Sequence, residues 1–233
     1  MRAALGFLTI VGGAAAPDRR SAVWFAPVGA ALGLAVGLIW WGAGELWPPL
    51  LAATLAVTAD AVLTGMLHLD GLSDSADGLL PPLERSRRLD VLSDPRAGAF
   101  GVVAVVLVLG LRIAALATLD PDPLLLAGLW GAARAAMGVT LATVPYARPG
   151  GGLATAFTGT PLAPSLLGGL LALALVPLAI GWPGLAAALA LVVGSAAVIA
   201  LAQARLGGFT GDVLGAAGLV GETCGLVLAA ARW

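Results

Sequence analysis

The chain has 233 residues, of which 60% are hydrophobic and 11% are charged, and its formal net charge is -1. Soluble domains contain roughly 25% charged residues, so this composition excludes an ordinary soluble domain and indicates a polytopic membrane protein. The near-zero charge excludes the basic surface that nucleic-acid binding requires, and the lone cysteine excludes an internal disulfide.

Apolar stretches long enough to cross a bilayer, which takes about 20 residues, recur along the whole chain. The first segment, Met1–Ala16, is apolar but short and glycine-rich, which favours an interfacial or re-entrant position. Turn residues separate the later stretches and no second domain is marked, so we predict one all-α membrane helix bundle over residues 1–233. The seven predicted spans are Pro27–Ala43, Leu46–Leu67, Phe100–Leu119, Leu124–Val144, Ser165–Ile180, Leu185–Leu201 and Val213–Ala231.

The twelve basic residues are all arginine, and their distribution predicts the orientation in the membrane. Cytoplasmic loops are enriched in Lys and Arg. Arginines occur before the first span and in every second connection, and only the terminal Arg232 departs from this alternation. The pattern predicts a cytoplasmic N-terminus and an outer C-terminus. It also places the stretch Gly65–Gly101 and the loops Tyr146–Pro164 and Gly207–Asp212 together on the cytoplasmic side.

The stretch Gly65–Gly101 contains the only histidine, His68, and six of the thirteen acidic residues. Asp70, Asp74 and Asp77 are spaced four and three apart, which places them in one stripe of a helix. Like charges at this spacing repel each other. Mg²⁺ binds oxygen ligands and shares them with phosphates, so it would remove the conflict. The pattern indicates a metal site for phosphoryl transfer at a membrane surface; the alternative is a solvated acidic loop balanced by nearby arginines.

Small residues and a further aspartate flank this stripe. Gly71, Ser75 and Gly78 form a parallel stripe, which predicts room for a bulky ligand near the backbone. Asp94 precedes Pro95, which is typical of a helix N-cap followed by Pro at the first helical position. Asp94 could cap a helix in this way, or it could close the metal site from a second helix.

His68 leaves two roles open. On a continuous helix it lies about 160° from Asp70, away from the acidic stripe. Either Gly71 marks a break that brings the two together, or His68 acts apart from the acids. It could be the general base for a hydroxyl nucleophile, or a buried hydrogen-bonded residue.

Two arginines, Arg112 and Arg134, fall inside predicted spans. A charged side chain at the centre of a membrane helix costs roughly 2.5–3.5 kcal/mol on insertion scales and usually faces a cavity or a partner. The pair could clamp the anionic groups of a phosphorylated substrate. Alternatively, they could form an internal ion pair, with Asp60 as the obvious partner, or Arg112 could snorkel to the outer surface.

Two glycine-rich segments complete the polar side. The loop Gly207–Asp212 precedes a predicted helix, where backbone N–H groups suit a phosphate. Glycines 211, 215, 218 and 225 share a stripe with Glu222, a spacing typical of close helix packing in lipid, and Glu222 is expected to form a hydrogen bond or contact substrate. Tyr146–Arg148, followed by three glycines, could close over a ligand or simply connect two spans.

These segments, in order along the chain, resemble the blocks of the cobalamin synthases, also named adenosylcobinamide-GDP ribazoletransferases. Residues 68–78, HLDGLSDSADG, resemble the family's HLDGLADTADG, and residues 93–98, SDPRAG, resemble its second acidic motif. Ala133-Arg134, residues 146–148, and residues 208–216 with Glu222 resemble the remaining blocks. The N-terminus departs from the family pattern. The family usually reads Phe-x-Thr-Arg followed closely by Pro, whereas here Phe7-Leu8-Thr9 leads to Ile10 and a Gly/Ala run before Pro17.

The resemblance implies a Mg²⁺-dependent catalytic domain of the bacterial inner membrane whose active site faces the cytoplasm. It would join α-ribazole, or its 5′-phosphate, to adenosylcobinamide-GDP and release GMP, a late step of cobalamin biosynthesis. Membrane lipid surrounds such a domain, and formation of a homo-oligomer is left open. Asp70, Asp74, Asp77 and Asp94 would hold the metal, and His68, Asp70 or Asp74 would take the hydroxyl proton. Predicted substrate contacts are Arg96, Arg134, Tyr146, Arg148, Thr210, Asp212 and Glu222.

Two other functions compete with this interpretation. A CDP-alcohol phosphotransferase would carry an Ala-Arg step soon after its first Asp-Gly, whereas Asp70-Gly71 is followed by Leu-Ser-Asp. A cation-coupled transporter would place its acids near the bilayer midplane on broken helices, whereas these acids are predicted at the rim.

Overall fold

The computed structural model of the protein describes residues 1–13, 16–148 and 150–232. These residues form ten α-helices and two short 3-10 helices, and the only β-type pairing among them is an isolated bridge between Tyr146 and Phe209. Six helical segments are long and apolar enough to cross a membrane, and a bent pair makes a seventh candidate. The prediction of an all-α, multi-pass membrane protein is therefore confirmed.

The six unbroken spans match six of the predicted ones, although their ends differ by up to five residues. Prolines at the first positions of α7 and α9, and a left-handed glycine after α9, help to set these ends. The spans are α2 (Phe25–Gly44), α6 (Ala99–Thr118), α7 (Pro123–Thr143), α8 (Leu162–Ile180), α9 (Pro183–Leu206) and α10 (Gly211–Ala229).

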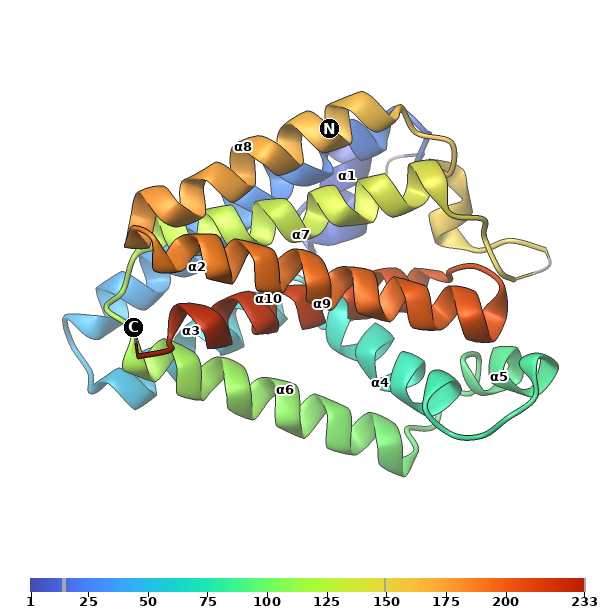
Figure 1. Ribbon diagram of the computed structural model, residues 1–233, viewed down its shortest axis with the longest axis horizontal. Helices are drawn as coiled ribbons and strands as arrows, with labels where there is room; N and C mark the ends of the chain where they lie inside the picture. Colours follow the sequence, from blue (N-terminus) through green and yellow to red (C-terminus); the bar gives the residue numbers. More distant parts are fainter. Residues whose placement is uncertain (14–15, 149, 233) are drawn as a thin grey trace.

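Helices α7 and α10 form the buried middle of the bundle, whereas α6, α8 and α9 lie outside it (Figure 1). Helix α2 packs closely along α7 because its glycines let the two backbones approach. A Cβ atom at Gly29 would lie 2.6 Å from the carbonyl oxygen of Trp130, and one at Gly37 would lie 2.6 Å from Cα of Pro123. Large side chains at these positions would separate the two helices.

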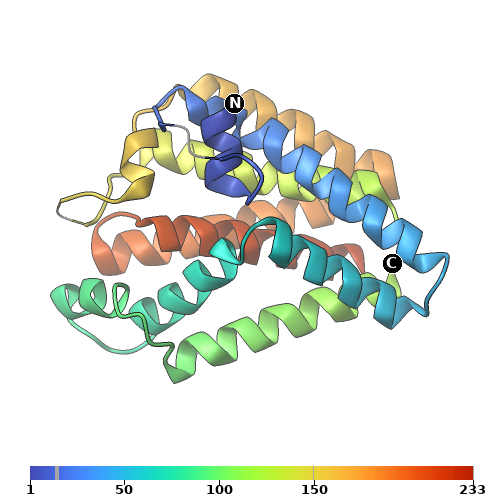
Figure 2. The same cartoon turned by 180° about the vertical axis from the view of Figure 1, so that it is seen from behind.

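The predicted second span, Leu46–Leu67, is wrong beyond Leu63. Helix α3 (Pro49–Leu63) ends there, and α4 (Leu67–Leu79) continues at an angle of 87°. Gly65 and Met66 both adopt left-handed backbone, with φ of 59°, and turn the chain inside the bundle (Figure 2). The break therefore precedes His68, and Gly71 lies inside a continuous helix rather than at the break.

The N-terminal segment reaches this same break. Helix α1 (Arg2–Leu8) packs against α2, and the backbone N–H of Ile10 donates to the carbonyl of Leu63 over 3.0 Å. The Ile10 side chain also covers Gly65. Of the two predicted positions for the first residues, these contacts favour the re-entrant one.

The predicted polar segments gather at one end of the bundle. Helices α4 and α5 (Arg85–Val91), the connection between α7 and α8, and the turn between α9 and α10 share the end opposite the C-terminus (Figure 1). The prediction that these three stretches lie on one face is confirmed.

Candidate active site

A polar cavity of about 370 Å³ opens at this end of the bundle. Its walls come from α1, the start of α4, the connection after α7 and the first turns of α10. Four predicted site residues supply its polar side chains: His68, Tyr146, Arg148 and Asp212. The structure therefore brings together groups that lie up to 144 positions apart in the chain.

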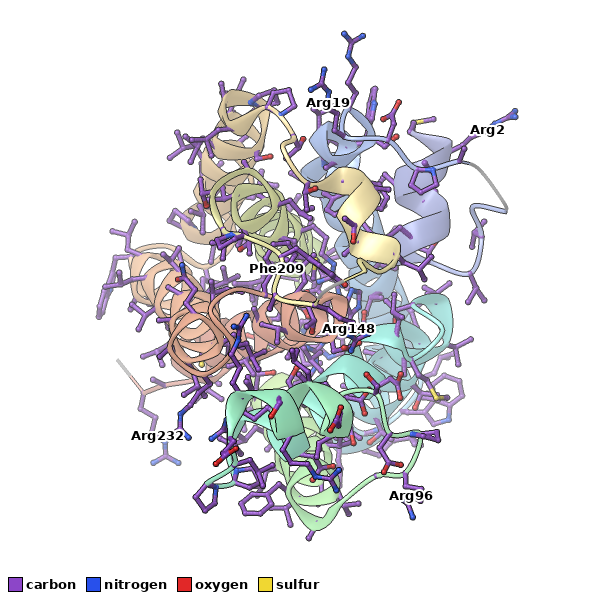
Figure 3. All side chains as sticks on the ribbon, turned by 90° about the vertical axis from the view of Figure 1, so that its right-hand side faces the viewer. Arg2, Arg19, Arg96, Arg148, Phe209 and Arg232 are labelled. Carbon is purple, nitrogen blue, oxygen red and sulfur yellow. The ribbon has the colours of Figure 1, made fainter. Side chains whose placement is uncertain are left out.

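Two connections far apart in sequence hold one wall of the cavity. The N–H of Ala147 donates to the carbonyl of Phe209 over 2.8 Å, and the N–H of Phe209 donates to the carbonyl of Pro145 over 3.0 Å. The rings of Tyr146 and Phe209 meet edge to face, with centroids 5.3 Å apart. Figure 3, which looks onto this end, shows Phe209 and Arg148 near its centre. These contacts hold the Tyr146–Arg148 segment against the turn before α10 as a wall of the cavity, and its closure over a ligand stays a prediction.

The loop before α10 places an acid beside a cation. Thr210 caps α10, accepting from the N–H of Val213, and its hydroxyl donates to Asp212 over 3.2 Å. Nη2 of Arg148 lies 3.6 Å from the Asp212 carboxylate and 3.4 Å from the carbonyl of Leu92. Thr210 is fully buried, so its role in the structure is to fix the start of α10 and the Asp212 side chain.

Asp70 and Asp74 lie on one continuous helix, as the spacing predicts, with Asp70 exposed and Asp74 half-buried. Asp74 lies within electrostatic range of three other carboxylates, those of Asp70, Asp77 and Asp212, and of one cation, Arg148. The negative charge around Asp74 therefore exceeds the positive charge. Such a site attracts a cation, and its oxygen atoms are the ligands that Mg²⁺ prefers.

The donor set fits Mg²⁺ only when substrate oxygens contribute as well. In the described ranges no group of three His, Cys, Asp or Glu side chains is close enough to hold a metal ion by itself. Mg²⁺ is usually bound through one or two carboxylates together with phosphate oxygens and water. Asp70 and Asp74 meet that requirement, while the binding of one metal by all four predicted acids stays a prediction.

Asp77 has a structural task. Its Oδ2 accepts from the N–H of Gly98 over 2.7 Å, and its Oδ1 accepts from the N–H of Gly101 over 3.0 Å. These two N–H groups begin α6, where orphan donors need acceptors and where a negative charge is favoured. Asp77 therefore caps α6 from another helix, and its predicted metal contact stays a prediction.

Replacing Asp77 with Ala should destabilise the protein by about 1 kcal/mol, within the range of roughly 0.5–2 kcal/mol that loss of a helix cap costs. Denaturant unfolding in detergent, without Mg²⁺, measures this change. Asp90→Ala is the control, because Asp90 has an exposed side chain on α5. Unchanged stability with a raised Mg²⁺ requirement for activity would assign Asp77 to the metal instead.

Asp94 does not begin a helix, so the predicted N-cap is wrong. Residues 92–98 form turns, and α6 begins only at Ala99. The Asp94 carboxylate instead binds its near neighbour Arg96, with Nη2 2.7 Å from Oδ2, and the hydrogen bonds from the Arg96 side chain and backbone lower the pKa of Asp94 to about 2. Arg96 lies at the periphery of the view in Figure 3. Their predicted metal and phosphate contacts stay predictions.

The stripe of small residues beside the acids holds protein and leaves no room for a ligand. A Cβ atom at Gly71 would lie 2.7 Å from the carbonyl oxygen of Asp212, and one at Gly78 would lie 2.6 Å from the Leu92 side chain. Ser75 is buried as well. Close packing of α4 against its neighbours is what these residues permit, and it brings Asp212 next to the acidic stripe.

Behind the cavity lies a chain of buried charges. Nη2 of Arg112 is 2.8 Å from Asp60, and Nη1 of Arg112 is 2.9 Å from Glu222. The other oxygen of Glu222 pairs with Arg134. The indole N–H of Trp130 donates to Asp60 over 2.8 Å, and the Arg112 guanidinium lies 4.7 Å from the Trp130 ring centroid. We call these five residues the charge chain.

The charge chain settles how the two intramembrane arginines are paired. The predicted pair between Arg112 and Asp60 is confirmed. The Arg112 side chain is 1% exposed, which excludes the alternative that it snorkels to the outer surface. Arg134 pairs with Glu222 rather than with Asp60. Arg134 and Glu222 do not line the polar cavity, and Arg134 approaches it only through His68. Their predicted substrate contacts stay predictions.

The glycine stripe of α10 serves helix packing, as its spacing predicts. A Cβ atom at Gly215 would lie 3.3 Å from Cδ2 of His68, and one at Gly225 would lie 2.7 Å from the Leu129 side chain. Gly218 is in close contact with Met137. Helices α4 and α7 therefore approach α10 closely enough for the charge chain to close.

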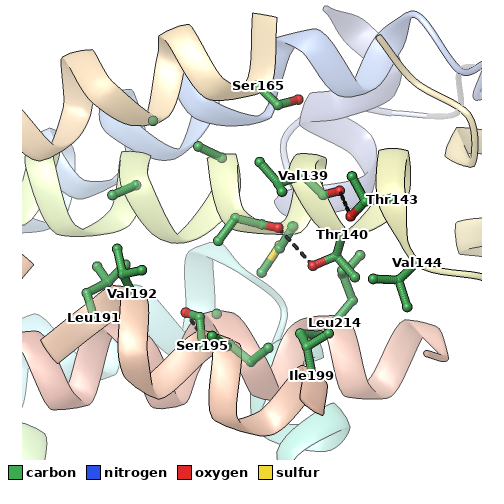
Figure 4. Close-up of a pocket in the computed structure, with 18 of the residues that line it drawn as sticks. Val139, Thr140, Thr143, Val144, Ser165, Leu191, Val192, Ser195, Ile199 and Leu214 are labelled. Carbon is green, nitrogen blue, oxygen red and sulfur yellow. Dashed lines mark hydrogen bonds between the residues drawn. The ribbon is translucent and has the colours of Figure 1, made fainter. Parts of the chain in front are cut away.

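A larger cavity, of about 560 Å³, lies between α7, α8 and α9 (Figure 4). None of the described residues that line it is charged. The hydroxyls of Thr140, Thr143 and Ser195 already donate to backbone carbonyls. Although this cavity is larger, it offers a diphosphate no charged partner, so the polar cavity is the candidate active site.

Two residues, Arg88 and Trp130, have structural roles that the sequence pattern did not predict. The i,i+4 spacing of Glu84 and Arg88 predicts a surface pair. That prediction is wrong, because Arg88 is buried and donates to the carbonyls of Gly78 and Leu79 at the end of α4. Trp130 was one apolar residue of a span, yet it binds Asp60. Basic side chains near the C-terminal end of a helix often bind its last carbonyls, and this pattern could have indicated the contact of Arg88 with α4.

The chain matches one family model over nearly its whole length, and similar proteins from three organisms share a single name. The family described as Cobalamin-5-phosphate synthase matches residues 1–230. A protein of Bradyrhizobium diazoefficiens named adenosylcobinamide-GDP ribazoletransferase is 38% identical over 99% of this chain and 93% of its own length. Proteins of the same name from Pseudomonas paraeruginosa (42% identical, 79% of this chain, 78% of its own) and Nocardioides sp. (39%, 85% and 81%) are also similar. No solved structure matches.

Proposed function

The chain belongs to the cobalamin-5-phosphate synthase family, and from this premise we propose that it is an adenosylcobinamide-GDP ribazoletransferase. It joins α-ribazole, or α-ribazole 5′-phosphate, to adenosylcobinamide-GDP and releases GMP, late in cobalamin biosynthesis. The observation that carries the assignment is the match over nearly the whole chain, which includes the residues of the polar cavity.

The reaction is a phosphoryl transfer between two oxygens. The hydroxyl oxygen of α-ribazole attacks the phosphorus nearest the corrinoid, and a new P–O bond forms. The bond from that phosphorus to the bridging oxygen breaks, and GMP leaves with that oxygen and its electron pair. The hydroxyl proton passes to a protein group and then to solvent. In such reactions the protein contributes mainly positioning and electrostatic stabilisation.

We assign Asp70 and Asp74 as the protein ligands of Mg²⁺. Bound there with phosphate oxygens, the ion would neutralise charge on the diphosphate and on the leaving group. Asp212 lies beside them and is the third carboxylate available, either to the metal or to the nucleoside hydroxyl. This assignment is supported by the surplus of negative charge around Asp74.

Arg148 is the cation best placed to hold a phosphate. It lines the polar cavity, is only part-exposed, and is held beside Asp212 and the Leu92 carbonyl. Its guanidinium presents a planar set of donors that suits phosphate oxygens. Tyr146 and Asp212 line the same cavity and complete the proposed substrate contacts.

We further propose that the polar end faces the cytoplasm of a bacterial inner membrane. Cytoplasmic loops are enriched in basic residues. Nine of the twelve arginines lie in the N-terminal segment or in the helices and connections of this end, and the other three are Arg112 in α6, Arg134 in α7 and the terminal Arg232. Both substrates would then reach the cavity from the compartment in which nucleotides are made.

The test is release of GMP by the purified protein in nanodiscs supplied with adenosylcobinamide-GDP, α-ribazole and Mg²⁺. We expect turnover that stops on chelation by EDTA and returns when Mg²⁺ is restored. GMP formation that persists in EDTA would contradict the metal assignment. Absence of a corrinoid product, or release of CMP from a CDP-alcohol in parallel assays, would contradict the proposed activity.

A further inference from the structure

We propose that Arg134 fixes His68 in the tautomer that carries its proton on Nε2. His68 then acts as a neutral hydrogen-bond donor to the bound diphosphate and not as the base that takes the hydroxyl proton. The identity of that ligand rests on the proposed function, whereas the tautomer rests on the protein alone.

The first step is the contact between the two side chains. Nη2 of Arg134 lies 3.5 Å from Nδ1 of His68, and both residues are buried. A guanidinium has only donors and stays protonated in proteins. The imidazole nitrogen that faces it must therefore accept, so Nδ1 carries no proton. In a neutral ring the proton then resides on Nε2.

The second step is that Arg134 cannot turn away. Its guanidinium pairs with Glu222, and Glu222 also binds Arg112, which is held in turn by Asp60. All four side chains are less than one-tenth exposed. Rotating Arg134 out of this charge chain would leave a buried carboxylate short of a partner, which is costly.

The third step concerns the ring itself. A Cβ atom at Gly215 would lie 3.3 Å from Cδ2 of His68, so the ring packs closely against α10. It lines the polar cavity together with Arg148 and Asp212. Because Nδ1 faces the Arg134 guanidinium and accepts from it, the ring has no second proton there and is neutral.

In this tautomer His68 donates to the phosphate, and another group must accept the proton of the attacking hydroxyl. An Nε2–H group can donate to a phosphate oxygen, but it has no free lone pair with which to take a proton. The proton of the attacking hydroxyl must then go to a carboxylate, and Asp70, Asp74 and Asp212 are the ones at hand. Arg134 is a positioning residue, since it acts through His68.

The tautomer can be read directly because His68 is the only histidine in the chain. Protein labelled with ¹⁵N-histidine in nanodiscs gives one pair of ring-nitrogen signals. We expect the directly bonded proton on Nε2 and none on Nδ1. A proton on Nδ1 in the unaltered protein would overturn the proposal, and this measurement needs neither substrate nor turnover.

Paired variants test the part played by Arg134. Glu222→Met alone keeps the donor but frees it from its carboxylate partner, so the Nε2–H tautomer should remain the major one with a smaller share. Arg134→Met combined with Glu222→Met removes the guanidinium and its charged partner together, and a second tautomer should appear. Arg134→Lys, in a chain that keeps Glu222, places a different donor at this position and should give the single Nε2–H tautomer again. A single Nε2–H tautomer in the double variant would show that another contact fixes the ring.

Turnover separates a donor from a base. The side-chain amide of Gln can donate from near the Nε2 position but is not basic, whereas Leu offers neither. We expect His68→Gln to keep GMP release within about tenfold of the unaltered protein. His68→Leu should lose more than about 100-fold, within the range that a positioned polar group contributes. Equal loss in both variants would favour the base and contradict the proposal.

Discussion

Replacing Asp74 with Asn is expected to abolish Mg²⁺-dependent release of GMP, with a loss of more than about 100-fold, because even loss of an outer partner of a metal ligand costs roughly 10–100-fold. Asp74 lies at the centre of the acidic cluster, within electrostatic range of Asp70, Asp77 and Asp212. Asn keeps the volume and one oxygen but removes the charge that attracts the ion. The measurement is the rate of GMP release against Mg²⁺ concentration.

The matched control is Asp90→Asn. Asp90 is another aspartate of the same polar end. Its side chain is 69% exposed, and it forms a loose surface pair with the exposed Arg87, with 3.9 Å between Nη1 and Oδ2. The control should therefore keep full turnover. If Asp74→Asn also turns over normally at every Mg²⁺ concentration, Asp74 has no part in the mechanism.

Replacing Glu222 with Gln should cost about 3–5 kcal/mol of stability, the usual result of removing one partner of a buried ion pair. Glu222 is fully buried between two guanidinium groups, those of Arg112 and Arg134. A neutral amide leaves both cations facing each other with only Asp60 to balance them. The free energy of unfolding in detergent, from denaturant titration, measures the loss.

Glu45→Gln is the control for this second experiment, because Glu45 lies exposed just after α2. It should change stability by no more than about 0.5 kcal/mol, as is usual for surface positions. An equally small effect of Glu222→Gln would mean that the two arginines are hydrated or paired elsewhere in the membrane, and the charge chain would lose its structural role.

Hydropathy was sufficient to predict six of the seven spans, because each is a single unbroken apolar helix. It failed at the second span, where the residues around Gly65 and Met66 are as apolar as the rest. The bend there depends on left-handed backbone and on the N-terminal segment that packs against it, neither of which has a hydropathy signal.

The candidate site was predicted in part. The spacing of Asp70 and Asp74 correctly placed them on one helix, and the arginine pattern correctly gathered three loops at one end. Partners across the bundle could not be read from spacing. Asp77 binds the start of α6, and Glu222 binds two arginines on separate helices, because tertiary packing determines which groups meet.

The contact between Ile10 and Leu63 also bears on how the protein is made. The backbone N–H of Ile10 finds its acceptor only after α3 has been synthesised and has ended at Leu63. The ribosome must therefore extend the chain well beyond its first segment before that segment can be seated. Gly6 and Phe7 line the cavity together with the first turns of α10, so the wall that the earliest residues supply is completed only after the last helix has been made.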